Sequence, residues 1–105
     1  MTFRVAKTRR AETDLANFAA YANNFSEAFA RETFERLDRV LSIHLAEAPH
    51  TWNYFYVTGA PYRAYLFRVG RRTNYWIVYT VDEDAKTVNV LRFWNASKEP
   101  ASFEI

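Results

Sequence analysis

The spacing of hydrophobic residues changes once along this chain, near Pro49, and that change constrains the fold more than any other feature. Between residues 9 and 47, apolar side chains recur every three or four positions, as on one face of an amphipathic helix. After Pro49, short runs rich in aromatic and β-branched residues alternate with turn-forming residues, which is typical of strands. A short alternating run at 3–7 precedes the helical part. This order predicts an α+β domain in which helices cover one face of a sheet and leave the other face open.

Two helices are expected in the first half of the chain. The first spans about 9–23, with Thr8 as its N-cap, and the second spans about 26–47, with Ser26 as its N-cap. On the polar side of the second helix, acids precede bases at a spacing of four, which supports a solvent-facing surface with the pairs Glu27–Arg31, Glu32–Arg36 and Glu35–Arg39. The pattern therefore predicts a helical hairpin with one apolar side.

The second half of the chain is expected to form the sheet. Strands are predicted at 62–69, 74–81 and 87–94, with a weaker one at 54–58. The connections between them are short, so the sheet should be a mainly antiparallel meander. Odd and even residues of a strand lie on opposite faces, but both sets are apolar here. The pattern alone leaves open which face the helices cover.

Composition excludes several kinds of site. With 105 residues the chain is expected to be one domain, 1–105. The absence of Cys excludes disulfides and thiolate zinc sites, and the two histidines, His44 and His50, are not at a metal-ligand spacing, so no metal is predicted. The two glycines, Gly59 and Gly70, cannot form a phosphate-binding loop, so no cofactor is predicted. No signal peptide or membrane span is recognisable, which predicts a cytoplasmic protein with no membrane partner.

Basic and aromatic residues occur together in the β-rich half. The chain has fourteen Lys and Arg against twelve acids, a net charge of +2, which by itself does not indicate a nucleic-acid partner. Residues 60–80, however, carry four Arg and no acid. Arg beside aromatic residues suits base stacking or a protein interface, and it equally suits a small core with a solvated strand edge. The candidate residues of a binding surface are Arg63, Arg68, Arg71, Arg72, Trp76, Arg92 and Trp94.

A series of short segments, taken in order, resembles the RelE/ParE toxin superfamily over about residues 3–98. These segments are Ala11-Glu12-Thr13-Asp14-Leu15, Gly-Ala-Pro-Tyr-Arg at 59–63, Val69-Gly70, Tyr75-Trp76-Ile77-Val78-Tyr79, Val81-Asp82-Glu83 and Val90-Leu91-Arg92. The resemblance implies a β-α-α-β-β-β(β) fold and the toxic half of a bacterial type II toxin–antitoxin pair. It also implies neutralisation by a cognate antitoxin whose C-terminal segment wraps the toxin. A homodimer and a toxin–antitoxin hetero-oligomer both stay open.

The superfamily divides by mechanism. RelE-like members cleave mRNA on the ribosome with basic residues, often joined by Tyr or His, on the open sheet face. ParE-like members inhibit DNA gyrase. Here Arg63 matches a basic position of the RelE-like pattern, but Tyr65 and Trp76 replace further bases, and Asn95 stands where many relatives place His. If the chain were RelE-like, the catalytic candidates would be Arg63, Tyr65, Arg92 and Lys98.

This depleted set of bases favours a ParE-like inhibitor that binds gyrase without catalysis. The alternatives are a ribosome-dependent mRNA endoribonuclease, whose partners would be the ribosome and mRNA, and a non-toxic interaction module of the same fold. In each case the aromatic sheet surface and an exposed strand edge are expected to accept a helix or strand of the antitoxin. Arg68, Arg71 and Arg72 would then meet acidic antitoxin residues.

Overall fold

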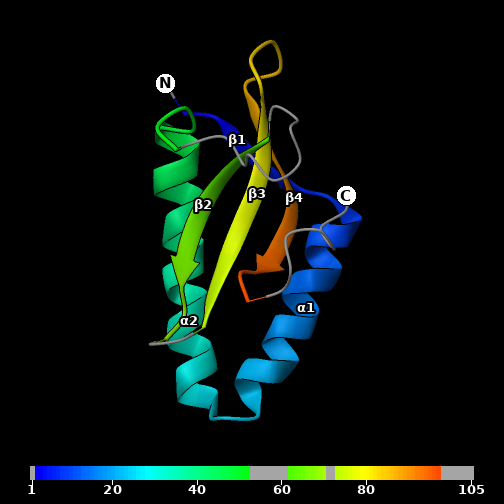
Figure 1. The fold of residues 1–105 in the computed structure, drawn as a ribbon. Helices are drawn as coiled ribbons and strands as arrows, with labels where there is room; N and C mark the ends of the chain where they lie inside the picture. Colours follow the sequence, from blue (N-terminus) through cyan, green and yellow to red (C-terminus); the bar gives the residue numbers. More distant parts are fainter. Residues whose placement is uncertain (1, 53–61, 71–72, 98–105) are drawn as a thin grey trace.

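A computed structural model describes residues 2–52, 62–70 and 73–97 of the chain. Two helices pack against a four-stranded sheet, as Figure 1 shows, so the predicted α+β fold and its β-α-α-β-β-β order are confirmed. The weak strand expected at 54–58 lies outside the described residues. In chain order the elements are β1 (Arg4–Lys7), α1 (Arg9–Asn23), α2 (Glu27–Arg39), η1 (Val40–Leu45), β2 (Arg63–Arg68), β3 (Asn74–Asp82) and β4 (Thr87–Asn95).

The strand order in the sheet is β1-β4-β3-β2, which puts β1 and β2 at opposite edges. Strands β2, β3 and β4 form the predicted antiparallel meander. Strand β1 is different, because it pairs in parallel with the first half of β4, from Thr87 to Val90. The helical hairpin carries the chain from β1 across one face of the sheet before the meander begins.

Both helices begin where the sequence predicts. The Thr8 hydroxyl accepts a hydrogen bond from the Ala11 amide at 3.2 Å, and the Ser26 hydroxyl accepts one from the Phe29 amide at 2.9 Å. The second helix changes character near its end, since α2 continues into a π-helical segment, η1. In this region the Ser42 hydroxyl donates to the Asp38 carbonyl at 2.7 Å.

The expected acid–base pairs along α2 do not form ion pairs within 4.0 Å among the described residues, so that expectation is wrong. Arg36 turns toward the sheet instead, where its guanidinium donates to the Arg68 carbonyl at 2.8 Å and to the Val69 carbonyl at 3.4 Å. Exposed ion pairs between long side chains contribute only a few tenths of a kcal/mol, so backbone carbonyls compete well for this Arg.

The structure settles which face of the sheet the helices cover. On β2 and β3 the odd residues face them, including Phe67, Ile77 and the fully buried Tyr79. A bulge in the β3–β4 pairing lies between Val78 and Tyr79, and it shifts the parity of β4. As a result, the core residues of β4 are Val88, Val90 and then Phe93, which pack with helical residues such as Phe18, Leu37, Leu41 and Leu45.

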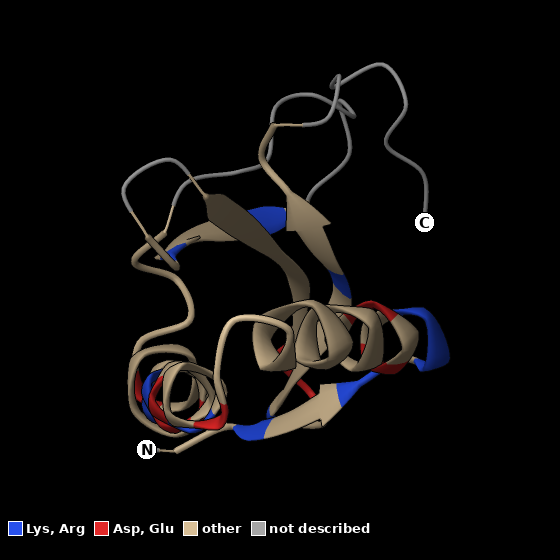
Figure 2. Ribbon diagram, turned by 90° about the horizontal axis from the view of Figure 1, so that it is seen from below, with Lys and Arg blue, Asp and Glu red and all other residues tan. Residues whose placement is uncertain are grey.

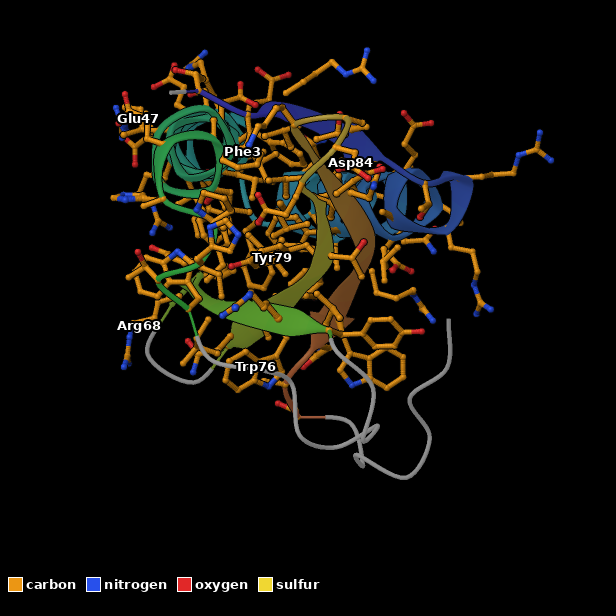
Figure 3. The ribbon with its side chains drawn as sticks, turned by 90° about the horizontal axis from the view of Figure 1, so that it is seen from above. Phe3, Glu47, Arg68, Trp76, Tyr79 and Asp84 are labelled. Atoms are coloured by element: carbon orange, nitrogen blue, oxygen red, sulfur yellow. The ribbon has the colours of Figure 1, made fainter. Side chains whose placement is uncertain are left out.

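The opposite face carries no helix of the described chain, in line with the expectation of one free side. Even so, Ala64, Val78 and Trp94 on that face are buried. Trp76 lies there too, pointing away from the helices in Figure 3, and it remains partly exposed. Within the residues that the structure describes, no helix has the length and apolar character needed to cross a membrane.

Candidate interaction site

Arg63 and Tyr65 lie on the helix-facing side of β2. The Arg63 guanidinium donates to the Trp52 carbonyl at 2.7 Å and to the His50 carbonyl at 3.3 Å. The Tyr65 ring stacks on His44 with centroids 5.9 Å apart and meets Trp52 edge-on at 4.7 Å. Arg63 thus links the segment after η1 to the sheet through hydrogen bonds. Tyr65 is part of an aromatic cluster between the sheet and that segment.

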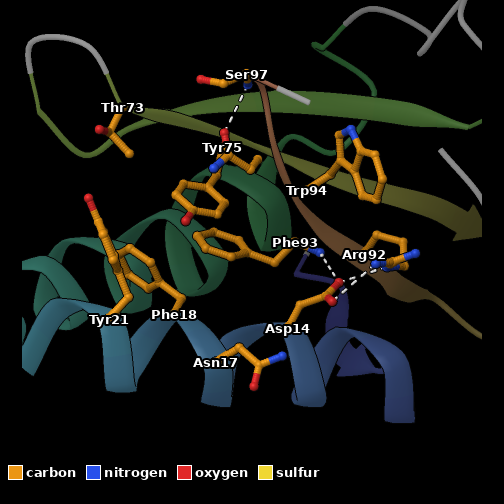
Figure 4. A pocket seen from close by; sticks show the side chains of 11 residues that line it. Asp14, Asn17, Phe18, Tyr21, Thr73, Tyr75, Arg92, Phe93, Trp94 and Ser97 are labelled. Carbon is orange, nitrogen blue, oxygen red and sulfur yellow. Dashed lines mark hydrogen bonds and ion pairs between the residues drawn. The ribbon is translucent and has the colours of Figure 1, made fainter. Parts of the chain in front are cut away.

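Arg92 lies on the other face, because it pairs with Val78 across the β3–β4 ladder. Its Nε is 2.7 Å from Asp14 Oδ2 and its Nη2 is 3.1 Å from Asp14 Oδ1, while the two side chains are only 8% and 15% exposed. The guanidinium also lies 5.0 Å from the ring of Trp94. Figure 4 shows this bidentate contact between Arg92 and Asp14 at the wall of a pocket. The positive charge of Arg92 is therefore neutralised inside the protein.

Asp14 has a second role, which explains why an acid is needed on α1. Strand β1 ends at Lys7, so among the described residues no strand pairs with the rest of β4 on that side. There the Thr8 hydroxyl donates to the Leu91 carbonyl at 3.0 Å, and Asp14 Oδ2 accepts the Phe93 amide at 3.0 Å. Side chains of α1 and its cap thus replace the missing strand.

The remaining predicted site residues are scattered. Trp76 and Trp94 are directly paired across β3 and β4 on the outer face, beside Arg92. Arg68 is exposed at the far edge of the sheet, at the end of β2. Three other candidates, Arg71, Arg72 and Lys98, lie outside the described residues. The structure thus joins Arg92 with the two tryptophans, and it puts Arg63 with Tyr65 on the opposite face.

A groove of about 440 Å³ runs between the second helix and the edge strand β2, and we call it the β2 groove. Its walls combine cations with apolar side chains, and no acid is among its described lining residues. Ile43 is 46% exposed there. Arg36 closes one end, because it bonds to the carbonyls at the end of β2 and lies over the Phe67 ring at 5.3 Å. The lining residues are Arg36, Arg39, Val40, Ile43, His44, Tyr65, Leu66, Phe67 and Arg68.

Sequence reasoning missed most of this groove. The spacing of Arg36 and Arg39 from acids indicates a solvent-facing helix surface, and His44 is considered there only as a metal ligand. The available signal was Ile43, an apolar residue outside the stripe that packs on the sheet, one position before His44. An apolar residue beside two arginines on the exposed face of a helix is typical of a binding surface.

A second pocket, of about 320 Å³, lies between α1 and the C-terminal half of β4 (Figure 4). Its aromatic wall includes Tyr75 and Phe93, stacked at 4.5 Å, with Phe18 packed edge-on against Tyr75 at 5.0 Å. Burial raises the pKa of the Tyr75 phenol, with a smaller contribution from Tyr21. Among the described residues, no three His, Cys, Asp or Glu gather into a metal-binding group.

Comparison with known families identifies the chain. A family model described as "ParE toxin of type II toxin-antitoxin system, parDE" matches residues 5–100. The chain belongs to this ParE toxin family. The predicted resemblance to the RelE/ParE superfamily is thereby confirmed, and membership of the family implies a cognate antitoxin as partner. No curated protein matches the sequence.

Proposed function

We propose that this toxin acts by binding and inhibiting DNA gyrase, not by cutting RNA. The observation that supports this most is the separation of the basic candidates: Arg63 bonds to loop carbonyls on one face of the sheet, and Arg92 is buried against Asp14 on the other. RNA cleavage needs a base and a charge-stabilising group within hydrogen-bond reach of one phosphate. Arg63 and Arg92 lie on opposite faces of the sheet and cannot contact one phosphate together, and Tyr65, on the face of Arg63, packs against His44 and Trp52. Acting on gyrase also implies a cytoplasmic location.

The test runs two assays side by side with the purified toxin. We expect loss of gyrase supercoiling of relaxed plasmid, and intact mRNA on programmed ribosomes. Cleaved mRNA with unaffected supercoiling would establish the endoribonuclease alternative, and Arg63→Ala should then abolish cleavage. No effect in either assay, together with normal growth on induction without antitoxin, would leave the non-toxic interaction module.

For the antitoxin, we propose the β2 groove as its docking site. An edge strand can accept an extended segment through backbone hydrogen bonds, and the groove beside it offers pockets for side chains. The exposed Ile43 favours an apolar residue in that segment, and Arg39 and Arg68 favour acidic ones. Arg71 and Arg72 are proposed to extend this basic surface.

Charge reversal tests the docking site. Arg39→Glu and Arg68→Glu should each weaken antitoxin binding at least tenfold at low salt and flatten its salt dependence. Arg31→Glu is the matched control, since Arg31 is exposed on the same helix but does not line the groove. Equal effects of Arg31→Glu and Arg39→Glu would show that only the overall charge matters, and the docking site would be rejected.

A further inference from the structure

A row of exposed aromatic rings lies where α1 passes into α2. The Tyr21 and Phe25 rings meet edge-on with centroids 5.1 Å apart, and the Phe25 and Phe29 rings lie 5.7 Å apart. Phe25 is 65% exposed and Tyr21 is 39% exposed. We call Tyr21, Phe25 and Phe29 the aromatic row. Figure 1 shows the connection between α1 and α2 at the end of the molecule opposite the β3–β4 turn.

Local structure explains an apolar residue at position 25 but not its exposure. A hydrophobic residue just before an N-cap often packs on the first turn of the helix that follows, and Phe25 precedes the N-cap Ser26. Here the contact with Phe29 leaves most of Phe25 in water. Adjacent exposed apolar residues, unlike scattered ones, are typical of an interaction surface.

The aromatic row is held in place by α1. Phe18, which is 2% exposed, packs against Tyr21 at 6.3 Å and connects the row to the core. In the connection between the helices, the Asn24 amide donates to the Tyr21 carbonyl at 3.2 Å, and the Phe25 amide donates to the Ala22 carbonyl at 3.1 Å. A partner therefore meets a preformed surface, and binding orders few further groups.

The segment that carries Tyr21 and Phe25 is uncharged. Residues 15–26 contain no Asp, Glu, Lys or Arg, although charged residues make up 25% of the chain. Figure 2 looks at the molecule from this end and shows the connection between the helices without blue or red. Glu27 follows in the first turn of α2, where the helix itself favours an acid.

The exposed neighbours of the two rings are small or polar residues, Ala20, Asn23, Asn24 and Ser26. Amides and hydroxyls both donate and accept hydrogen bonds, so each can pair with a group of its own kind. Two copies of this surface can therefore meet without like-charge repulsion. Two copies of the basic β2 groove cannot.

We propose that the aromatic row is the contact between two copies of this chain, related by a two-fold axis near Phe25. Such an interface uses the same surface on both molecules, so that surface must be complementary to itself. Phe25 lies at nearly equal distances from Tyr21 and Phe29, so a half-turn about it exchanges the two outer ring positions. Aromatic rings pair edge to face, and a row of rings can supply both sides of that contact.

This dimer is independent of the function proposed above. None of the three rings is among the described lining residues of the β2 groove, so the inference rests neither on antitoxin docking nor on gyrase as the target. Interfaces below about 1,200 Å² of total buried area typically give weak, transient complexes. A contact made by three rings from each copy is small, and the dimer should therefore dissociate on dilution.

Sedimentation velocity of the purified chain, from low micromolar to submillimolar concentration, tests the proposal. The weight-average mass should rise from that of one chain toward that of two. Phe25→Asn should raise the dissociation constant at least tenfold, because it removes the central ring of the contact. Ile43→Asn is the matched control, since it removes a 46% exposed apolar side chain from the β2 groove instead. It should leave the dissociation constant unchanged.

A second measurement keeps all three rings. Because the chain has no Cys, Asn24→Cys introduces a single thiol next to Phe25. Copies related by an axis near Phe25 should form an intermolecular disulfide under mild oxidation. Asp84→Cys, exposed in the β3–β4 turn at the opposite end, is the control. It should crosslink at least tenfold more slowly, because the proposed contact does not raise the local concentration of its thiol.

Support requires association that Phe25→Asn weakens and Ile43→Asn does not, with both variants keeping the circular dichroism spectrum of the parent protein. A monomer at every concentration would overturn the proposal. Association weakened by Ile43→Asn and not by Phe25→Asn would put the contact at the β2 groove, and the aromatic row would be rejected. Equal crosslinking of Asn24→Cys and Asp84→Cys would contradict a two-fold axis near Phe25.

Discussion

At the scale of single residues, Asp14 on α1 binds two groups of β4 that lie far from it in the sequence. It neutralises Arg92 and accepts the Phe93 amide, all in a largely buried position. Removing the acid from a buried pair leaves an uncompensated charge, which typically destabilises a protein by about 3–5 kcal/mol. We therefore expect Asp14→Ala to lower the free energy of unfolding by that amount, measured by urea denaturation.

Asp84→Ala serves as the control, because Asp84 is exposed in the β3–β4 turn. It should change the free energy of unfolding by no more than about 0.5 kcal/mol. If Asp14→Ala were as mild as Asp84→Ala, the pair with Arg92 would not contribute to stability. Restoring stability by combining Asp14→Ala with Arg92→Met would identify the unpaired guanidinium as the cause of the loss.

Because of Tyr79, the free energy of unfolding should decrease as the pH rises in the alkaline range. Its hydroxyl is fully buried and donates to the Pro49 carbonyl at 2.6 Å, and burial raises its pKa above the ordinary value, with Arg63 acting weakly in the opposite direction. A phenol whose pKa is higher in the folded state stabilises the protein fully below about pH 10, its unfolded value, and this contribution is lost as the pH rises further.

The variant Tyr79→Phe isolates this effect from the other tyrosines and lysines. It should cost about 1–3 kcal/mol at pH 8, because the Pro49 carbonyl loses its donor. Between pH 9 and 11 it should then lose less stability than the parent protein, as measured by urea midpoints at each pH. Parallel curves for the two proteins would contradict the proposed role of the phenol.

At the scale of elements, the sequence predicts where helices and strands lie better than it predicts which face of the sheet each side chain is on. The helix starts at Thr8 and Ser26 follow from local hydrogen bonding of short polar side chains, and so they were predictable. The bulge between Val78 and Tyr79 was not, because it depends on how two strands pair and not on either strand alone. Since it shifts the parity of β4, Arg92 and Phe93 could not be assigned to faces from the sequence.

The same limit applies to the candidate site. Arg36 was predicted to pair with Glu32 on the helix surface, but tertiary contact with the end of β2 outweighs a weak local pair. The apolar and basic residues of the β2 groove come from two segments separated by about twenty residues, and only the packing of the helix on the sheet brings them together.

Arg36 also gives a prediction at this scale, since it ties the end of β2 to α2. Arg36→Leu retains packing on Phe67 but removes both bonds to the β2 carbonyls. Hydrogen exchange of the Val69 and Gly70 amides, which donate to Thr73, should accelerate at least tenfold, while amides of β4 keep their protection. Uniform acceleration across the sheet, or none at all, would contradict a local role.

At the scale of the whole molecule, the β2 edge of the sheet is proposed to bind the antitoxin. Ile43→Asn should weaken antitoxin binding at least tenfold, because Ile43 lines the β2 groove and is 46% exposed. The salt dependence of binding should stay that of the parent protein, because the substitution removes no charge. Both quantities are measured by anisotropy titration with labelled antitoxin. Unchanged affinity of the variant would contradict docking at this groove.

The hydrogen bonds from Thr8 and Asp14 to the backbone of β4 affect how the sheet can pair with another chain. Beyond Lys7, the part of the chain that the structure describes covers the β4 edge with Thr8 and Asp14 and not with a strand, and β1 itself is only four residues long, with a cation at each end. An incoming chain finds little backbone to pair with on that side. A strand that adds to the sheet is therefore expected at β2, the docking site proposed for the antitoxin. We therefore expect one antitoxin segment to bind per sheet, without edge-to-edge polymerisation of the toxin.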